Sequence, residues 1–106
     1  MILKQLRLDI DPYKVEQLIV IERAPQTKLV TCHNIRDQFV IWYFEPTEIE
    51  ADAVLVEIPI LILKEGASEP KRKNSGSHSL LGMIEGAYGW FDAVVIVERR
   101  HKYLWL

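Results

Sequence analysis

Four side chains in the sequence are of the kinds that bind transition metals: Cys32, His33, His78 and His101. Zinc sites in small proteins usually pair such ligands about two to five residues apart, and the sequence contains no such pair. Cys32 and His33 are adjacent in a predicted strand, where neighbouring side chains point to opposite faces. We therefore predict no metal site and no cofactor, with Cys32 buried and His33 facing solvent.

A cluster of hydroxyl groups surrounds one of these histidines. Ser75, Ser77 and Ser79 flank His78 in a polar, glycine-containing segment. A catalytic serine needs a base and an orienting group that are held in place, and no G-x-S-x-G motif occurs. The composition is typical of a solvated linker, so we do not expect a hydrolase.

Carboxylates gather after the most apolar stretch of the chain, at Glu48, Glu50, Asp52 and Glu57. Acid–base catalysis requires paired carboxyl groups whose surroundings move their pKa values apart, and the sequence shows no such asymmetry. A charged segment that prevents strands of different molecules from pairing is the interpretation we favour. We predict that the protein is not an enzyme.

A basic loop is the best candidate for binding phosphate. Its candidate ligand-binding residues, for a phosphate or a nucleotide, are Lys71, Arg72, Lys73, Ser77 and His78. Cationic side chains and small hydrogen-bond donors can hold phosphate oxygens, although the spacing of a Walker motif is absent. The alternative is a solvated basic loop with no ligand.

A basic and aromatic segment, residues 99–106, follows the last predicted strand. Cations beside aromatic rings suit single-stranded nucleic acid, and Arg, Tyr and Trp also anchor protein interfaces. A third interpretation is that its apolar side chains fold back on the core. The candidate interface residues are Arg99, Arg100, Tyr103, Leu104 and Trp105. Because an exposed apolar cluster favours self-association, we predict a homo-oligomer.

Length and composition predict one domain spanning residues 1–106, of which 49% are apolar, with a formal charge of −2. This charge provides no overall basic field for nucleic acid. With a single cysteine and no apolar stretch of a signal peptide after Met1, we expect a cytoplasmic protein. The longest apolar run contains Glu57 and Pro59 and is too short to cross a bilayer as a helix, so we expect no membrane partner.

Runs of β-branched and aromatic residues, separated by turn signals, predict an all-β protein. The short links favour antiparallel pairing into a compact sandwich or partly open barrel of six to seven short strands. At most one short helical turn is expected, near Val15. A long polar loop is expected at 64–79 and predicted to be mobile. The predicted strands cover residues 2–10, 18–21, 28–33, 38–45, 53–63, 80–84 and 90–98.

Two strands carry specific predictions. Residues 38–45 are apolar on both faces, so this strand should be central or covered on both sides, with Trp42 buried. Pro59 cannot donate a backbone hydrogen bond, so the strand over 53–63 should either lie at an edge there or bulge and split in two.

Three apolar segments carry a family resemblance: Phe39-Val40-Ile41-Trp42, Ser79-Leu80-Leu81-Gly82-Met83, and Ala93-Val94-Val95-Ile96-Val97-Glu98. They resemble strands of a family of small, uncharacterised all-β proteins common in phage and bacterial genomes. That family's Gly-Thr-Gly-His-like turn is replaced here by Lys64-Glu65-Gly66-Ala67, without the histidine.

The resemblance implies a phage or mobile-element accessory protein that binds or inhibits a host protein, such as a component of bacterial defence. The function predicted from the sequence is therefore non-catalytic protein binding. The alternative is a nucleotide- or RNA-binding module that uses the loop containing Lys71, Arg72 and Lys73.

Overall fold

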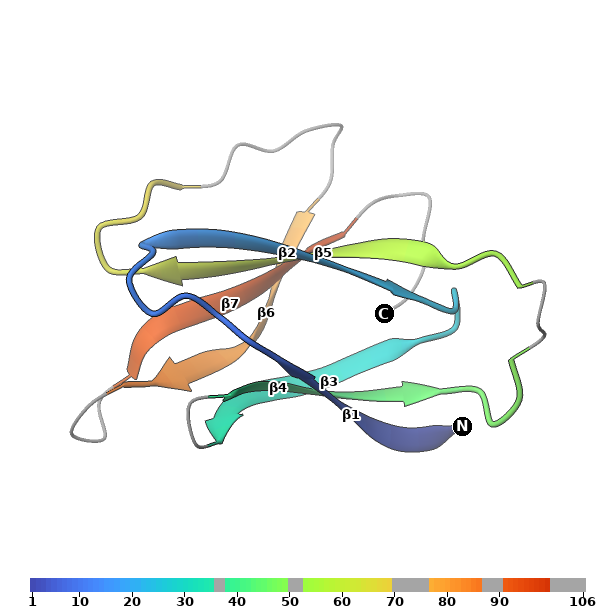
Figure 1. Cartoon of the computed structure of the whole chain (residues 1–106). Helices are drawn as coiled ribbons and strands as arrows, with labels where there is room; N and C mark the ends of the chain where they lie inside the picture. Colours follow the sequence, from blue (N-terminus) through green and yellow to red (C-terminus); the bar gives the residue numbers. More distant parts are fainter. Residues whose placement is uncertain (36–37, 50–52, 70–76, 87–90, 100–106) are drawn as a thin grey trace.

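Two antiparallel sheets face each other across one core in this computed structural model of the protein (Figure 1). The structure describes residues 1–35, 38–49, 53–69, 77–86 and 91–99, without the side chains of 77, 78, 98 and 99. Seven strands and no helix occur in these ranges, which confirms the predicted all-β sandwich. No helical turn forms near Val15, within the predicted maximum of one, because a simple turn at Pro12 and Tyr13 leads directly into a strand.

The first sheet has three strands in the order β1-β4-β3. Strand β4 lies between its two neighbours, as the apolar character of both its faces predicted. Ile35 and Gln38 are the last paired residues of the β3–β4 hairpin. The bounds are Ile2–Leu8 for β1, Lys28–Ile35 for β3 and Gln38–Glu45 for β4.

The second sheet has four strands in the order β2-β5-β7-β6. Strands β6 and β7 form an antiparallel hairpin, whereas β2 and β5 are far apart in sequence. The bounds are Glu16–Arg23 for β2, Val56–Lys64 for β5, Ser77–Glu85 for β6 and Phe91–Arg99 for β7.

Successive side chains of a strand point to opposite faces, so every second side chain lies between the two sheets. The most deeply buried of these side chains come from the central strands, and the residues beside them in sequence face outward. They are Phe39 and Ile41 of β4, Ile58, Ile60 and Ile62 of β5, and Val95 of β7. The core thus lies between the central parts of the two sheets. Its burial determines which face of each strand points inward.

Strand β5 passes through Pro59 without a shift in register. Pro59 is paired with Val20 of β2, and the registered pairing with β7 begins one residue later, at Ile60. Proline therefore occupies a position where β5 has a registered neighbour on one side only. The prediction of an edge at this residue is confirmed, and the alternative of a split strand is wrong.

The prediction that Trp42 is buried is wrong, because it lies on the outer face of the three-stranded sheet and is only partly buried. Its indole N–H donates to Nε2 of His33 over 3.2 Å, and the two rings meet edge to face with centroids 6.2 Å apart. Phe44, on the same face, is also exposed. Val40, on the same side of β4, is fully buried.

Strands β3 and β6 approach closely at one corner of the sandwich. A Cβ atom placed on Gly82 would lie 2.7 Å from the sulfur of Cys32 and 3.0 Å from its carbonyl oxygen. Each strand also has a β-bulge nearby, at Val30 in β3 and at Leu81 in β6. Such bulges bend strands and increase their twist. Glycine therefore permits the backbones of the two sheets to meet here.

Candidate binding surfaces

The outer face of the four-stranded sheet carries a continuous row of aliphatic side chains. Leu18, Leu61, Ile96 and Leu80 are successive cross-strand partners and cross all four strands. The two at the sheet edges are strongly exposed, Leu18 by 60% and Leu80 by 66%. We call this surface the outer apolar face; its residues are Leu18, Val20, Leu61, Leu63, Leu80, Met83, Val94 and Ile96.

A groove of about 530 Å³ adjoins the outer apolar face. Leu63, Met83 and Val94 form one wall, and Phe91, which is 62% exposed, lies beside them. The opposite wall is the segment 65–69 that leaves β5, where Gly66 adopts a positive φ of 96°. The groove extends the apolar area past the ends of the strands.

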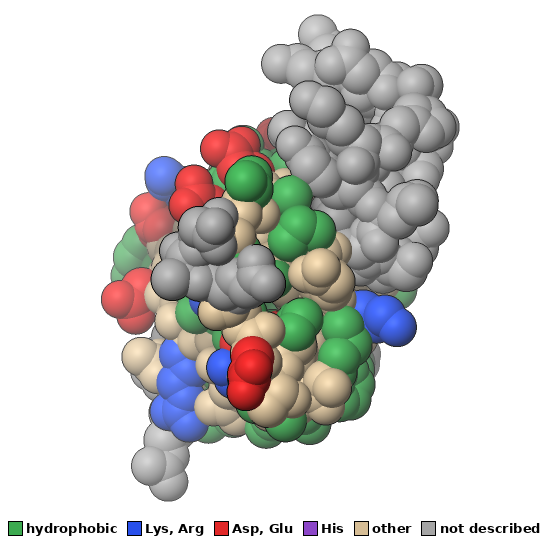
Figure 2. All heavy atoms as spheres, turned by 90° about the vertical axis from the view of Figure 1, so that its right-hand side faces the viewer, with side chains coloured by type: hydrophobic (Ala, Val, Ile, Leu, Met, Phe, Trp, Pro, Cys, Tyr) green, Lys and Arg blue, Asp and Glu red, His purple; other side chains and the backbone are tan. Residues whose placement is uncertain are grey.

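Acidic residues predominate among the described charged residues at the margins of this face. Glu22 and Glu57 are directly opposite each other at one end of β2 and β5, and Glu16 is opposite Leu63 at the other end. Glu65, Glu69 and Asp92 line the groove, together with one cation, Lys64. Figure 2 views the molecule from the end where β2 finishes and β5 begins, and acidic side chains gather in its upper left part. The outer apolar face is thus bordered by negative charge.

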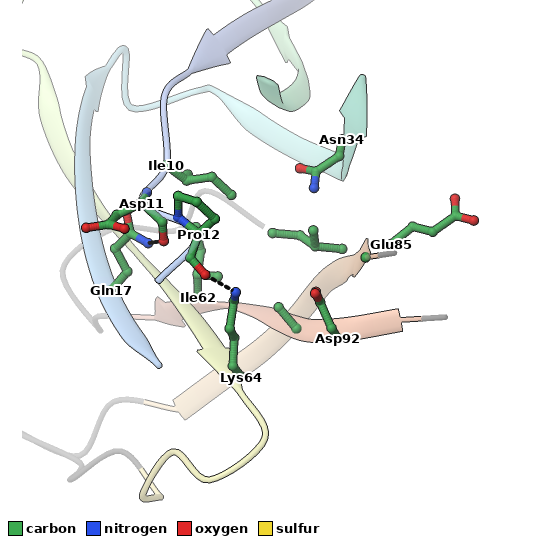
Figure 3. Close-up of a pocket in the computed structure, with 12 residues that line it drawn as sticks. Ile10, Asp11, Pro12, Gln17, Asn34, Ile62, Lys64, Glu85 and Asp92 are labelled. Carbon is green, nitrogen blue, oxygen red and sulfur yellow. Dashed lines mark hydrogen bonds between the residues drawn. The ribbon is translucent and has the colours of Figure 1, made fainter. Parts of the chain in front are cut away.

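A second candidate is a cavity of about 510 Å³ between the two sheets (Figure 3). Its apolar wall includes Ile62, Ile84 and Ala93, and Asp92 provides a carboxylate, whereas the carboxylate of Glu85 points away from the space in Figure 3. This volume is within the range of small-molecule sites, which are concave and mostly apolar with a few polar groups.

Several polar groups of the cavity already form hydrogen bonds within the protein. Lys64 donates to the carbonyl oxygen of Pro12, and the Gln17 side chain bonds to the backbone N–H and carbonyl of Asp11 at 2.9 and 3.0 Å. The amide of Asn34 points toward the space in Figure 3. Its Oδ1 atom is buried and accepts no hydrogen bond from any described residue.

Cys32 and His33 lie on opposite faces of β3, as predicted. Burial raises the pKa of the Cys32 thiol to about 12, so that the thiolate is scarce near neutral pH. The imidazole of His33 accepts from Trp42 on the outer face. Within the ranges that the structure covers, no three His, Cys, Asp or Glu residues are grouped as metal ligands.

The candidate phosphate-binding residues are described only in part. Ser77 and His78 begin β6, where their backbones pair with Arg99 and Glu98 of β7. The chain position that follows the basic loop therefore lies beside the position where the basic tail begins. Two sets of candidates lie outside the described residues, namely Lys71, Arg72 and Lys73 of the loop and Arg100, Tyr103, Leu104 and Trp105 of the tail. The predicted bounds of the loop, 64–79, are too wide, because Lys64 belongs to β5 and Ser77 begins β6. Its predicted mobility stays a prediction.

Comparisons with protein-family models, with curated proteins and with solved structures gave no match. The resemblance to the phage and bacterial family thus stays a prediction. In the part of the chain that the structure covers, no helix is long and apolar enough to cross a bilayer.

Proposed function

We propose that the protein is a non-catalytic binding protein that contacts a protein partner through its outer apolar face. The observation that supports this most is the aliphatic row from Leu18 to Leu80, which crosses the whole sheet and is strongly exposed at both edges. Contiguous apolar patches larger than a few hundred Å² are rare on monomeric proteins and usually mark interaction sites.

The chemistry of the face favours contact over catalysis. Its side chains are aliphatic or thioether groups, which supply packing area and no general acid, base or nucleophile. The acidic residues at its ends, Glu16, Glu22 and Glu57, form the polar rim that usually surrounds the apolar centre of an interface. The family resemblance suggests a host protein as the partner.

An affinity capture from bacterial lysate tests this proposal. The tagged wild type is compared with Leu18→Glu, which places a charge in the row, and with Leu3→Glu. Leu3 is the matched control because it is 50% exposed on the other sheet. We expect wild type and Leu3→Glu to retain the same proteins and Leu18→Glu to lose them. Equal capture by all three variants would exclude the outer apolar face as the binding surface.

Nucleotide or RNA binding is a second candidate function. It is favoured by the pairing of Ser77 with Arg99, because the basic loop and the basic tail join the sheet at neighbouring positions. Binding of a fluorescent single-stranded RNA should then weaken steeply with salt, since each neutralised phosphate releases counterions. Replacing Lys71, Arg72 and Lys73 with alanine should reduce both affinity and the salt slope. An affinity that salt does not change would reject this function.

A further inference from the structure

We propose that the outer apolar face is covered by a second copy of this chain, so that two molecules form a symmetric dimer with their four-stranded sheets face to face. The inference rests on the proposed function because it uses the same surface. The second copy occupies the face in the free protein, and a host partner would have to displace it. A twofold contact of this kind brings one patch against itself, so the patch must complement its own shape and chemistry.

The size of the face fits this occupant. The four strands contain eight or nine residues each. With strands about 4.8 Å apart and a rise of about 3.3 Å per residue, the sheet presents roughly 500 Å². Two copies would therefore bury about 1,000 Å² together, which is where specific interfaces begin. The side chains project from the sheet, so their accessible area exceeds this flat value.

The chemistry of the face also fits a copy of itself. The inner faces of β5 and β7 already pack against another sheet through Ile58, Ile60, Ile62 and Val95. The outer faces of the same strands repeat this aliphatic composition with Leu61, Leu63, Val94 and Ile96. Two such faces can interdigitate as the two sheets of a sandwich do, about 10 Å apart. The dimer would thereby contain a third aliphatic layer between its two molecules.

The charges predict how salt affects this dimer. Glu16, Glu22 and Glu57 lie at the ends of the face, and no described residue of the outer apolar face is basic. Two copies therefore bring like charges near each other at the margins of an uncharged centre. Screening reduces this repulsion, so salt should strengthen the dimer, whereas it would weaken the binding of a basic partner.

Sedimentation equilibrium of the full chain, over a wide concentration range and at low and high salt, tests the proposal. We expect a monomer–dimer equilibrium whose dimer fraction rises with salt. Leu18→Glu and Leu80→Glu should each be monomeric at concentrations where the wild type is dimeric, and Leu3→Glu should behave like the wild type. Circular dichroism establishes that each variant is folded.

Three results would overturn the proposal: a monomer at every concentration and salt, a dimer unaffected by both Leu18→Glu and Leu80→Glu, or equal disruption by Leu3→Glu. A truncation to residues 1–102 identifies a different occupant. If the truncated chain dimerises while the full chain is monomeric, the C-terminal segment covers the face and the proposal is wrong. If no dimer forms but Leu18→Glu still abolishes capture from lysate, only the dimer fails and the proposed function stands.

Discussion

Replacing Gly82 with alanine tests whether the close approach of β3 and β6 fixes the corner of the sandwich. The new methyl group would lie 2.7 Å from Sγ of Cys32 and 3.0 Å from its carbonyl oxygen. Favourable separations between nonbonded heavy atoms are about 3.5–4.0 Å, so the sulfur or the strand must move by roughly 1 Å. Because one of the two atoms belongs to the backbone, side-chain rotation alone cannot relieve the overlap.

The expected loss of unfolding free energy follows from this overlap. Overpacking a core typically lowers the unfolding free energy by about 1–3 kcal/mol. Replacing a glycine restricts the unfolded chain, which raises the unfolding free energy by roughly 0.4–1 kcal/mol. We therefore expect Gly82→Ala to destabilise the protein by about 1 kcal/mol. Cys32→Ala should cost about 1 kcal/mol on its own, because it removes one buried heavy atom.

The double variant separates the clash from other effects. In Gly82→Ala combined with Cys32→Ala, the new methyl group occupies space that the sulfur has left. The two losses should then be non-additive, with the double variant more stable than their sum predicts by at least about 1 kcal/mol. Urea denaturation followed by tryptophan fluorescence measures all four proteins. A change under about 0.5 kcal/mol for Gly82→Ala, or additive losses, would refute this packing.

Four further predictions concern single groups. Because burial raises its pKa to about 12, the thiol of Cys32 should react with iodoacetamide at pH 8 far more slowly than in the unfolded chain, and equal rates would show that it is accessible. Thr27→Val should raise the unfolding free energy by about 1 kcal/mol in urea titrations, since Oγ1 of Thr27 is buried without a hydrogen-bond partner among the described residues, and a loss of stability would reveal one. Trp42→Ala should cost about 1–3 kcal/mol, less than the roughly 3–5 kcal/mol of a fully buried aromatic, and a larger loss would indicate that Trp42 is covered. The hydrogen bond to Glu45 raises the pKa of Lys4 above its ordinary value of 10.5. The contribution of this pair to folding stability is therefore complete below pH 10.5 and is lost as the pH rises through the raised pKa. Lys4→Met should reduce this alkaline loss of stability in denaturation curves, and an unchanged loss would contradict the prediction.

The strands could be predicted because each has a local signature that the fold preserves. In β1, Leu6 and Leu8 alternate with polar residues and pack against the core. In β4, apolar residues at consecutive positions indicated a central strand, and β4 is central. Both inferences use only neighbouring residues and the period of two that a strand imposes.

The outer apolar face could not be predicted from the sequence in the same way. Its row exists because Leu18, Leu61, Ile96 and Leu80 share a register, and register depends on pairings between residues far apart in the chain. The error at Trp42 has a related cause. Apolar residues on both faces of a strand show that each face is suited to contact, but they do not show what covers it.

The cavity between the sheets was also beyond prediction from the sequence. Asn34 comes from β3, Lys64 from β5 and Asp92 from β7, and no spacing along the chain relates them. The predicted strand over 28–33 ended just before Asn34, so the sequence did not indicate that this residue lies in β3 and lines the cavity.

The strand order also has a consequence for the time course of folding. β1 and β2 are made first, yet Leu8 pairs with Phe39, Ile2 with Glu45, and Glu16 with Leu63. At roughly 5–20 residues per second of synthesis, both strands wait several seconds for their partners. The local hairpins β3–β4 and β6–β7 can close as soon as they emerge. Strand β1 therefore awaits the β3–β4 hairpin, and β2, with its exposed leucine at position 18, awaits β5. The new chain is most vulnerable to aggregation in that interval.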